Sequence, residues 1–486
     1  MSEAGAEITD ARLRPVLTSS RLSALPRPSR PIRSTLLSFL WPGLGQWYAG
    51  RTRAALIYFL PAALLALYLL AQVVFMGADQ FVAGLLDPNA ALTLGILVAV
   101  LGLWRLLSMA DALAASGGGR VLRGRAGVVI AALAAVVLLS HGVVGYYAWS
   151  LYAADSKIFV GDVSPDGNGG FGGGPAASDD YAIATPFATP KTASSRITIL
   201  LTGIDHTTSR TESLTDTMLV VSVNPATGAV SMVSLPRDVA EFPMWNGATY
   251  HGKINSLMSY ARAHPQDFPD GPLPTLVHEL SFLLGTQIHY YAAVDLDGFR
   301  RMVDVLGGVT VSVARAIDDP RYDWLDGSPY GFYLSAGVHT LDSRTALAFV
   351  RSRLGVGDSD FTRAARQQQL LVALRHKVTD PAMIPQVPSL MAIAGETIRT
   401  NFPPARLGEM LALAERTQDV NIVRVVLQPP TYSVHPPTAS TGGSYILRLD
   451  LAAVAKLSIE LYGSDSTYQA VAGSPGSPAP LPSPTP

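Results

Sequence analysis

Four arginines lie close together in one segment of this chain, residues 351–366. Charged residues make up only 15% of the 486 residues, so this density is unusual for the protein. The planar guanidinium group donates N–H bonds to two phosphate oxygens at once. Two interpretations are open at this point. The segment is either a clamp for a ligand with adjacent phosphates or the charged face of a surface helix.

Two aspartates stand at the ends of apolar runs. Asp205 follows the run at 197–204, and Asp216 precedes the run at 217–223. Carboxylates without a sulfur or histidine neighbour are hard oxygen ligands, which suit Mg²⁺ or Mn²⁺ shared with substrate phosphates. Aspartates also cap loops, which is the simpler explanation for either one alone. The nearby arginine cluster favours the metal–phosphate interpretation.

The strands expected around these aspartates bring them toward a third residue. Apolar, β-branched runs predict strands at 197–204, 217–223 and 229–235. The turn sequence Asn224-Pro-Ala-Thr-Gly228 predicts that the last two form a hairpin. In a hairpin, the start of one strand lies beside the end of the other. Asp216 and Arg237 are therefore expected at the same end of the sheet.

The arginine-rich segment divides into two expected elements. An extended backbone through Arg351-Ser-Arg353 would place both arginines on one face. A helix is expected over 360–377, with Asp360, Arg363 and Gln367 on one stripe. The charges gather at the N-terminal end of this helix, where the helix dipole favours anions.

Further periodic segments indicate the fold class of this part of the chain. Helices are expected at 274–284 and 298–307, and strands at 290–296 and 308–313. Helices and strands that alternate in this way predict an α/β or α+β domain, with a central β-sheet flanked by helices.

The N-terminal part of the chain has the pattern of a membrane region. Spans are expected at about 54–76, 90–109 and 126–148, each near the ~20 residues that a bilayer requires. The segment Ser34–Gly50 is short and broken, which favours a re-entrant or interfacial element. The basic residues of the loops predict a multi-pass protein of the cytoplasmic membrane. Its N-terminus is expected inside and its C-terminal domain outside.

The expected organisation has five parts. They are a disordered cytoplasmic tail at 1–33, the membrane region at 34–150, a flexible Gly-rich linker at 151–195, the globular domain at 196–463 and a disordered Pro/Ser-rich tail at 464–486. The absence of cysteine excludes disulfides, thiolate zinc sites and a cysteine nucleophile. A formal net charge of −1 gives no indication of a nucleic-acid partner.

The globular domain resembles the LytR-CpsA-Psr (LCP) family of cell-wall glycopolymer ligases. The motifs that carry the resemblance are Gly203-Ile-Asp205, Thr215-Asp216-Thr-Met218, Ser234-Leu-Pro-Arg-Asp238, Lys253-Ile-Asn255, Asp304-Val-Leu-Gly-Gly-Val309, Arg351-Ser-Arg353 and Asp360-Phe-Thr-Arg-Ala-Ala-Arg-Gln367. Each motif is short, but together they follow the family's order over nearly the whole domain.

The resemblance implies a set of site residues. It implies catalytic roles for Asp205, Asp216, Arg237 and Asp360, and a metal ion, Mg²⁺ or Mn²⁺, on Asp205 and Asp216. For the substrate pyrophosphate it implies Arg237, Lys253, Arg351, Arg353, Arg363, Arg366 and Gln367. Either Asp360 or Asp205 is expected to act as the base for the attacking hydroxyl.

The resemblance also implies a function. The expected enzyme is an Mg-dependent phosphotransferase that moves a glycopolymer from a polyprenyl-pyrophosphate carrier to peptidoglycan, with membrane lipid as a further partner. Two departures leave alternatives open: Leu214 stands where the family usually has arginine, and three spans replace the usual one. The alternatives are a polyprenyl-pyrophosphate phosphatase and a non-catalytic, lipid-binding regulatory membrane protein. The identity of the glycopolymer does not follow from the sequence.

Overall fold

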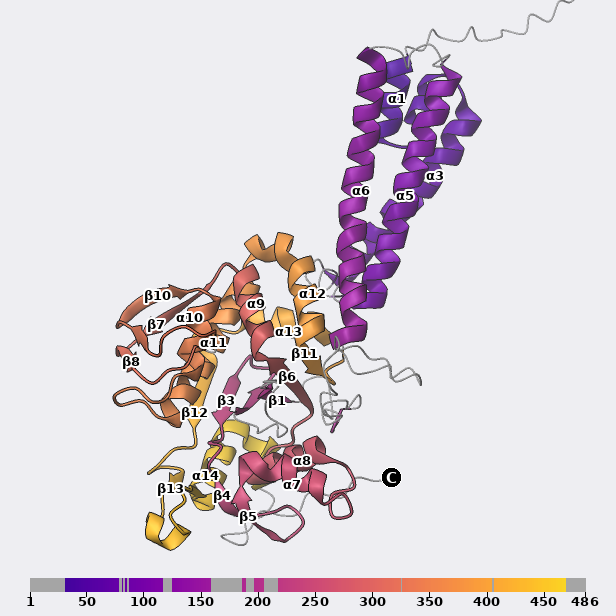
Figure 1. Ribbon diagram of the computed structural model, residues 1–486. Coiled ribbons are helices and arrows are strands. Elements are labelled where there is room, and N and C mark those ends of the chain that lie inside the picture. The colour runs from indigo at the N-terminus through magenta and orange to yellow at the C-terminus, as the bar shows by residue number, and fades with distance from the viewer. Residues whose placement is uncertain are drawn as a thin grey trace, which may run out of the picture. The chain divides into compact units, whose positions relative to one another are not determined.

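The computed structural model describes residues 31–77, 81, 84, 87–116, 125–158, 186–188, 196–204, 217–324, 326–403 and 406–468. The chain divides into two compact units. The first comprises Met1–Leu67 with Val100–Ser140, and the second Tyr68–Ala99 with His141–Pro486. Figure 1 shows the helical N-terminal part in indigo and purple and the mixed domain in magenta to yellow.

Helices make up the N-terminal part. They are α1 (Pro31–Leu40), α2 (Leu44–Tyr48), α3 (Thr52–Met76), α5 (Pro88–Ala115) and α6 (Arg125–Ile158). Three of them contain stretches long and apolar enough to cross a membrane, at Thr52–Phe75, Asn89–Ala115 and Gly127–Ala154. These helices correspond to the three spans that the sequence predicts, and they are the helices of a membrane-anchored protein.

The broken segment before the first span folds as the short helices α1 and α2, joined by a tight turn. Gly43 in this turn has φ +95°, and a Cβ there would lie 2.4 Å from the carbonyl oxygen of Ala55. The buried Gln46 accepts a bond from Ser38 Oγ (3.1 Å) and donates one to Ser108 O (2.8 Å). These hydrogen bonds therefore satisfy the buried Gln46 amide, as an apolar surrounding would require.

A six-stranded sheet forms the centre of the mixed domain. Its strands are β1 (Ile197–Ile204), β2 (Met218–Val223), β3 (Val230–Ser234), β6 (Tyr290–Asp295), β11 (Ile398–Thr400) and β12 (Ile422–Val426), in the order β11-β6-β1-β2-β3-β12. The pairs β1–β6 and β3–β12 are parallel, and the others are antiparallel. The predicted hairpin is confirmed, because Leu219 of β2 pairs with Ser234 of β3.

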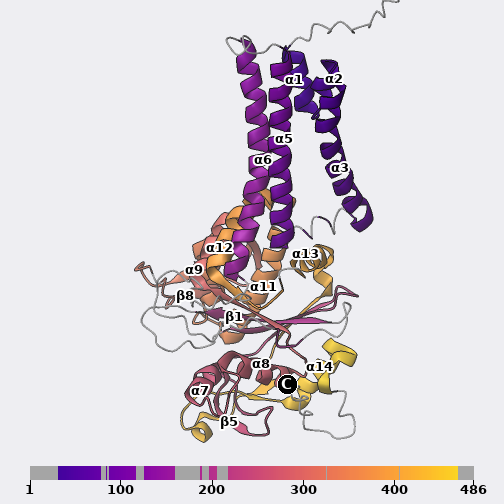
Figure 2. The ribbon, with the colours of Figure 1, turned by 90° about the vertical axis from the view of Figure 1, so that its right-hand side faces the viewer.

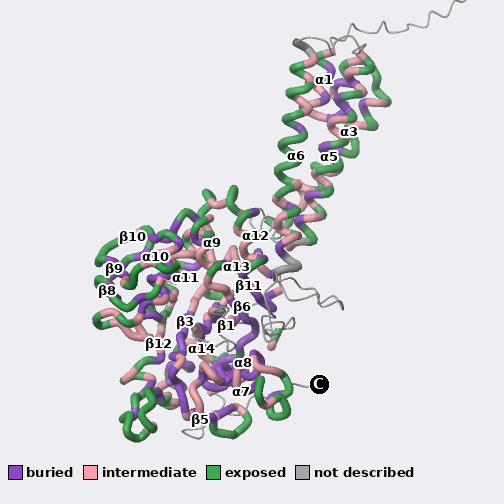
Figure 3. Tube along the Cα trace, viewed as in Figure 1, coloured by how far each residue is buried: buried purple, intermediate pink, exposed green. Residues whose placement is uncertain are grey.

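Helices cover both faces of this sheet, as Figure 2 shows. One face carries α7 (Leu257–Ala263), α8 (Pro272–Leu284) and α14 (Leu451–Tyr462). The other carries α9 (Leu296–Val305), α11 (Asp360–Val378), α12 (Val387–Thr397) and α13 (Leu407–Arg416). Leu200, Leu276 and Leu280 are fully buried in the core between the sheet and α8, and buried residues concentrate there in Figure 3. The fold class is the predicted one.

Short two-stranded sheets extend from this framework. They pair β7 (Val309–Val313) with β10 (Gly337–Leu341), β8 (Ile317–Asp319) with β9 (Phe332–Leu334), β4 (Ala240–Pro243) with β5 (Thr249–Lys253), and β13 (Ser433–Val434) with β14 (Arg448–Leu449). The helix α10 (Ser343–Arg351) packs with β7 in a second apolar core that contains Val309, Phe349 and Leu370. Of these elements, β8 contains Asp319 and α10 ends at Arg351.

The structure adds contacts near the predicted domain boundaries. Helix α6 continues to Ile158. Phe187 N donates to His289 O (3.0 Å), and the Phe187 ring packs 6.1 Å from the ring of Tyr291. The Tyr468 hydroxyl donates to Leu283 O (3.0 Å). Residues on both sides of the predicted 196–463 domain therefore pack against it. Residues 31–33 of the predicted N-terminal tail begin α1, residues 151–158 of the predicted linker end α6, and residues 464–468 of the predicted C-terminal tail are ordered, whereas residues 1–30 and 469–486 fall outside the described residues.

Candidate active site

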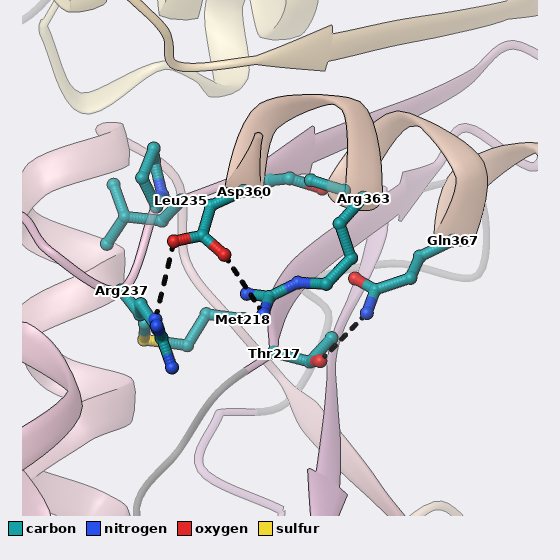
Figure 4. Close-up of a pocket in the computed structure, with 10 residues that line it drawn as sticks. Thr217, Met218, Leu235, Arg237, Asp360, Arg363 and Gln367 are labelled. Carbon is teal, nitrogen blue, oxygen red and sulfur yellow. Dashed lines mark hydrogen bonds and ion pairs between the residues drawn. The ribbon is translucent and has the colours of Figure 1, made fainter. Parts of the chain in front are cut away.

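Two adjoining cavities open where β3, α11 and the loop after α10 meet. The smaller, shown in Figure 4, is lined by Thr217, Met218, Ser234, Leu235, Pro236, Arg237, Asp360, Arg363, Ala364 and Gln367. The larger, of about 430 Å³, is lined by Pro236, Arg237, Asp238, Arg353, Leu354, Ser359, Asp360, Phe361, Tyr445 and Leu447. Asp360 and Arg237 belong to both linings and thus lie between the two cavities.

The carboxylate of Asp360 is the point on which three arginines converge. Its Oδ1 lies 3.0 Å from Arg363 Nη1 and 3.6 Å from Arg353 Nη1, and its Oδ2 lies 3.5 Å from Arg237 Nε. Figure 4 shows Arg237 and Arg363 reaching this carboxylate from different elements, the loop after β3 and the first turn of α11. Three guanidinium groups therefore surround one carboxylate, and a phosphate group can neutralise the remaining positive charge.

The protonation state of Asp360 follows from these neighbours. Burial acts to raise the pKa of the carboxyl, but the charges of Arg363, Arg237 and Arg353 together outweigh it and hold the pKa below its usual range. Asp360 is therefore ionised at neutral pH. A carboxylate with a lowered pKa is also a weak base while these ion pairs last.

A second buried carboxylate fixes the backbone that carries Arg353. Asp319 is 1% exposed, and its Oδ2 accepts bonds from Ser352 Oγ (2.8 Å), Arg353 N (3.2 Å) and Leu354 N (3.1 Å). Burial acts to raise the pKa of Asp319, yet these bonds and one from Arg321 N lower it. Asp319 thus holds the turn from which the Arg353 side chain reaches the cavity.

Arg366 has a different set of contacts from Arg363. Its Nη1 lies 3.1 and 3.0 Å from the two carboxylate oxygens of Asp358, and its Nη2 donates to Ser352 O. The guanidinium also lies over the ring of Phe349, 5.8 Å from its centroid. Arg366 is absent from both cavity linings. Its role in binding pyrophosphate stays a prediction, whereas its contacts join α10 to α11.

The extended backbone predicted through residues 351–353 is wrong. Arg351 is the last residue of α10, and the chain leaves the helix at Ser352. Arg351 and Arg353 therefore do not alternate along a strand, and only Arg353 lines a cavity. Burial raises the pKa of Tyr322, and the charge of neighbouring Arg351 partly offsets this effect. The helix continues because its apolar face packs into the second core, a tertiary effect that the short motif does not encode.

Gln367 and Lys253 lie beside the cavities. Gln367 Nε2 donates to Thr217 Oγ1 (3.2 Å), which ties α11 to the start of β2 (Figure 4). The predicted stripe is confirmed, because Asp360, Arg363 and Gln367 all line the smaller cavity. Lys253 forms an ion pair with Asp238, which lines the larger cavity. Its charge is therefore balanced by a motif residue to which the sequence assigned no role.

Asp205, Asp216 and Leu214 lie outside the described residues. Their described neighbours show where the flanking strands end: Thr202 of β1 pairs with Met218 of β2, and Thr217 lines the smaller cavity together with Arg237. Among the described residues, no group of three or more His, Asp or Glu could hold a metal. The metal site on the two aspartates stays a prediction.

The sequence of this chain matches a known protein family. The model described as the LytR_cpsA_psr family matches residues 176–457, more than half of the chain. The chain belongs to the LytR-CpsA-Psr family. The match covers the central sheet and all residues that line the two cavities.

Two similar curated proteins are named as transferases. The polyisoprenyl-teichoic acid–peptidoglycan teichoic acid transferase TagU of Oceanobacillus iheyensis is 30% identical over 217 residues, which is 44% of this chain and 62% of that protein. TagV of Bacillus subtilis, a transferase with the same description, is 29% identical over 218 residues, 45% of this chain and 52% of that protein. The matches thus span less than two thirds of either relative. The crystal structure of B. subtilis TagV aligns with a TM-score of 0.44 at 24% identity, covering 56% of this chain and 97% of that one.

Sequence reasoning missed several residues of this candidate site. Tyr445, Phe361 and Leu354 line the larger cavity, and Asp319 and Asp358 hold the loop between α10 and α11. Asp358 had a detectable signal, because it precedes the N-cap Ser359 of an arginine-rich helix. Tyr445 and Asp319 had none, since they reach the site only through the packing of distant segments.

Proposed function

We propose that this protein is a membrane-anchored phosphotransferase that moves a glycopolymer from a polyprenyl-pyrophosphate carrier to peptidoglycan. The observation that carries the proposal is the convergence of Arg237, Arg353 and Arg363 on one carboxylate between two cavities. Pyrophosphate offers several oxygens to such a set of planar donors. The names of the relatives TagU and TagV support the substrate class.

The proposed reaction is a displacement at phosphorus. A hydroxyl oxygen of peptidoglycan attacks the phosphorus that carries the glycopolymer, and a new P–O bond forms. The bond from this phosphorus to the bridging oxygen breaks, and polyprenyl phosphate leaves with the electron pair. The glycopolymer is then joined to peptidoglycan by a phosphodiester. The arginines neutralise the charge on the pyrophosphate oxygens during this displacement.

Asp360 has two successive roles in this proposal. In the free protein its carboxylate keeps Arg237, Arg353 and Arg363 turned toward the cavities. When pyrophosphate becomes the partner of these arginines, their lowering effect on the pKa of Asp360 decreases. The pKa then rises toward its usual range, and the carboxylate becomes a better acceptor for the proton of the attacking hydroxyl.

We also propose that Asp205 and Asp216 hold Mg²⁺ (or Mn²⁺). Carboxylates are suitable donors for these ions, and the strands that flank the two aspartates end at the edge where Thr217 lines the smaller cavity. The bound ion would neutralise part of the pyrophosphate charge. Arg351 is proposed to contribute positive charge around the site, whereas Lys253 and Arg366 are each balanced by an aspartate.

The proposed location follows from the apolar helices and the loop charges. The three helices anchor the protein in the cytoplasmic membrane, with the N-terminus inside. The domain then lies outside the cytoplasm, where peptidoglycan is available.

The test uses the full chain in lipid vesicles with a lipid-linked oligosaccharide and peptidoglycan. Covalently modified peptidoglycan is the expected product. Release of phosphorylated sugar without attachment would replace the proposal with the phosphatase. Tight binding of the lipid-linked substrate without any turnover would replace it with the non-catalytic lipid-binding protein.

A further inference from the structure

The larger cavity has an aromatic residue in its wall that the proposed chemistry does not use. Tyr445 lines this cavity together with the charged residues Arg353 and Asp360. The side chain is not part of the core, since the residue is 45% exposed. An exposed ring beside a cluster of phosphate-binding groups is therefore available to a ligand.

The ring of His435 supports the ring of Tyr445. The Tyr445 ring packs on that of His435, with 4.4 Å between centroids and 37° between planes. His435 Nδ1 lies 2.9 Å from Ile446 O, which fixes the imidazole to the same segment. The two rings thus form a supported surface, which loses little conformational freedom when a ligand binds.

Backbone hydrogen bonds attach the segment that carries Tyr445 to the loop that carries Arg237. Leu447 N donates to Asp238 O, and Ala240 N donates to Leu447 O, both at 2.9 Å. The pair β13–β14 closes the same segment at its base. Tyr445 and Arg237 are consequently held at the cavity by one shared backbone network, although they lie far apart in the sequence.

The lining of this cavity combines charged and apolar groups. Arg237, Asp238, Arg353 and Asp360 are charged and Ser359 is polar, whereas Pro236, Leu354, Phe361, Leu447 and the Tyr445 ring are apolar. A sugar ring has the matching character, with C–H groups on one face and hydroxyls at its edge. Aromatic rings with a polar tip suit such mixed surfaces, and ligand pockets commonly pair apolar walls with a few polar groups.

A polyprenyl chain is the competing occupant and fits this cavity less well. A volume of about 430 Å³ is small for a chain of many isoprene units. Placing such a chain against four charged side chains would also remove water from those charges without replacing its hydrogen bonds. The composition of the lining therefore favours a saccharide.

We infer that Tyr445, backed by His435, is a stacking platform for the sugar that is joined to the pyrophosphate. The inference rests on the proposed function, because it places the sugar next to the phosphates held by Arg237, Arg353 and Arg363. It assigns the larger cavity to the saccharide end of the donor. Tyr445 is in this sense a specificity-determining residue.

The experiment compares two ligands on the full-length protein in detergent. One is a polyprenyl pyrophosphate with a single attached sugar, and the other is the same carrier without sugar. We expect the wild-type protein to bind the sugar-bearing carrier more tightly. In Tyr445→Ala this advantage should fall by about tenfold, the change in affinity that 1.4 kcal/mol gives. Affinity for the sugar-free carrier should stay unchanged, and Tyr445→Phe and Tyr445→Trp should keep the advantage.

Tyr333→Ala is the matched control, because Tyr333 is 68% exposed on β9 and lies outside both cavity linings. The inference is overturned if Tyr445→Ala keeps the full advantage of the sugar-bearing carrier. It is also overturned if this variant loses affinity for both carriers equally, which would assign the ring to the prenyl or phosphate part. A wild-type protein that binds neither carrier would instead refute the proposed function itself.

Discussion

Two aspartates near the start of α11, Asp358 and Asp360, both bind arginines but differ in burial and in the balance of charge around them. The Asp358 side chain is 3% exposed and binds Arg366 through both carboxylate oxygens, at 3.0 and 3.1 Å. The Asp360 side chain is 22% exposed and lies 3.0 to 3.6 Å from three different arginines. The first cluster is closed and well paired, whereas the second is open and has an excess of positive charge.

This difference separates a structural ion pair from a ligand site. A buried pair with good geometry has its charges satisfied, and breaking it leaves one charge without compensation. An open cluster with more cations than anions gains by taking up an external anion. Arg363 and Arg366 are three residues apart on one helix, yet the structure gives them these two different surroundings.

The largest expected effect is on catalysis at the open cluster. Arg237→Ala should reduce transfer to peptidoglycan by about 100- to 1,000-fold, since one donor to the developing charge is lost. Its thermal unfolding should stay close to that of the wild type, because the side chain is partly exposed and its Asp360 contact is long. Arg301→Ala is the control, as this arginine lies outside both cavity linings and forms an exposed ion pair with Glu396. Equal losses of activity in both variants would contradict the assignment.

The closed cluster should respond in stability instead. Arg366→Ala should lower the free energy of unfolding by about 3 kcal/mol, because Asp358 would remain buried without its main partner. Urea denaturation gives this value. Unchanged stability together with weaker pyrophosphate binding would return Arg366 to the ligand-binding set that the sequence predicts.

A third carboxyl group, that of Glu279, lies in the apolar core. Glu279 on α8 is fully buried and accepts a bond from Trp245 N (3.4 Å). Burial raises its pKa to about 8. The folded state therefore keeps the proton that the unfolded state releases above pH 4.5, so stability falls as the pH rises from about 4.5 to 8.

Glu279→Gln should remove this pH dependence. Relative to the variant, the wild type should lose up to about 1.4 kcal/mol per pH unit in this window, with no further loss above pH 8. Urea denaturation at several pH values measures the difference. Parallel stability profiles of the two proteins would show that Glu279 is ionised in the folded state.

The smallest expected effect concerns Asp360 as an internal anion. Asp360→Asn removes the carboxylate that competes for Arg237, Arg353 and Arg363, so inorganic pyrophosphate should bind severalfold to about tenfold more tightly. Isothermal titration calorimetry gives the affinity. Weaker binding would mean that Asp360 attracts the ligand through a metal or a hydrogen bond.

Local patterns in the sequence were sufficient for much of the fold. The strand at Ile197–Ile204 has the predicted bounds, and α11 begins at the predicted Asp360. The hairpin of β2 and β3 follows from a turn sequence whose Asn224 side chain binds the backbone of its own turn. These features depend on neighbours within a few residues, so periodicity and turn chemistry reveal them.

The candidate site was predictable only in part, because its motifs do not show how each side chain is oriented. Arg351 and Arg353 look equivalent in sequence, but the end of α10 at Arg351 places only Arg353 at a cavity. The backbone of Arg353 is held by Asp319, which comes from β8. No local pattern links these two residues, since their contact exists only after β8 packs beside the loop that follows α10.

The sequence alone determined which groups are available for chemistry: an arginine-rich segment, two aspartates at strand ends and three apolar spans. The tertiary structure decided which of these charges compensate one another. Arg366 is paired with Asp358 and Arg363 lies at the cavity, while Tyr445 reaches the site from a distant segment. The reason is physical: burial and pairing of charges depend on which segments pack together, and the free energy of each ion pair is set by that surrounding.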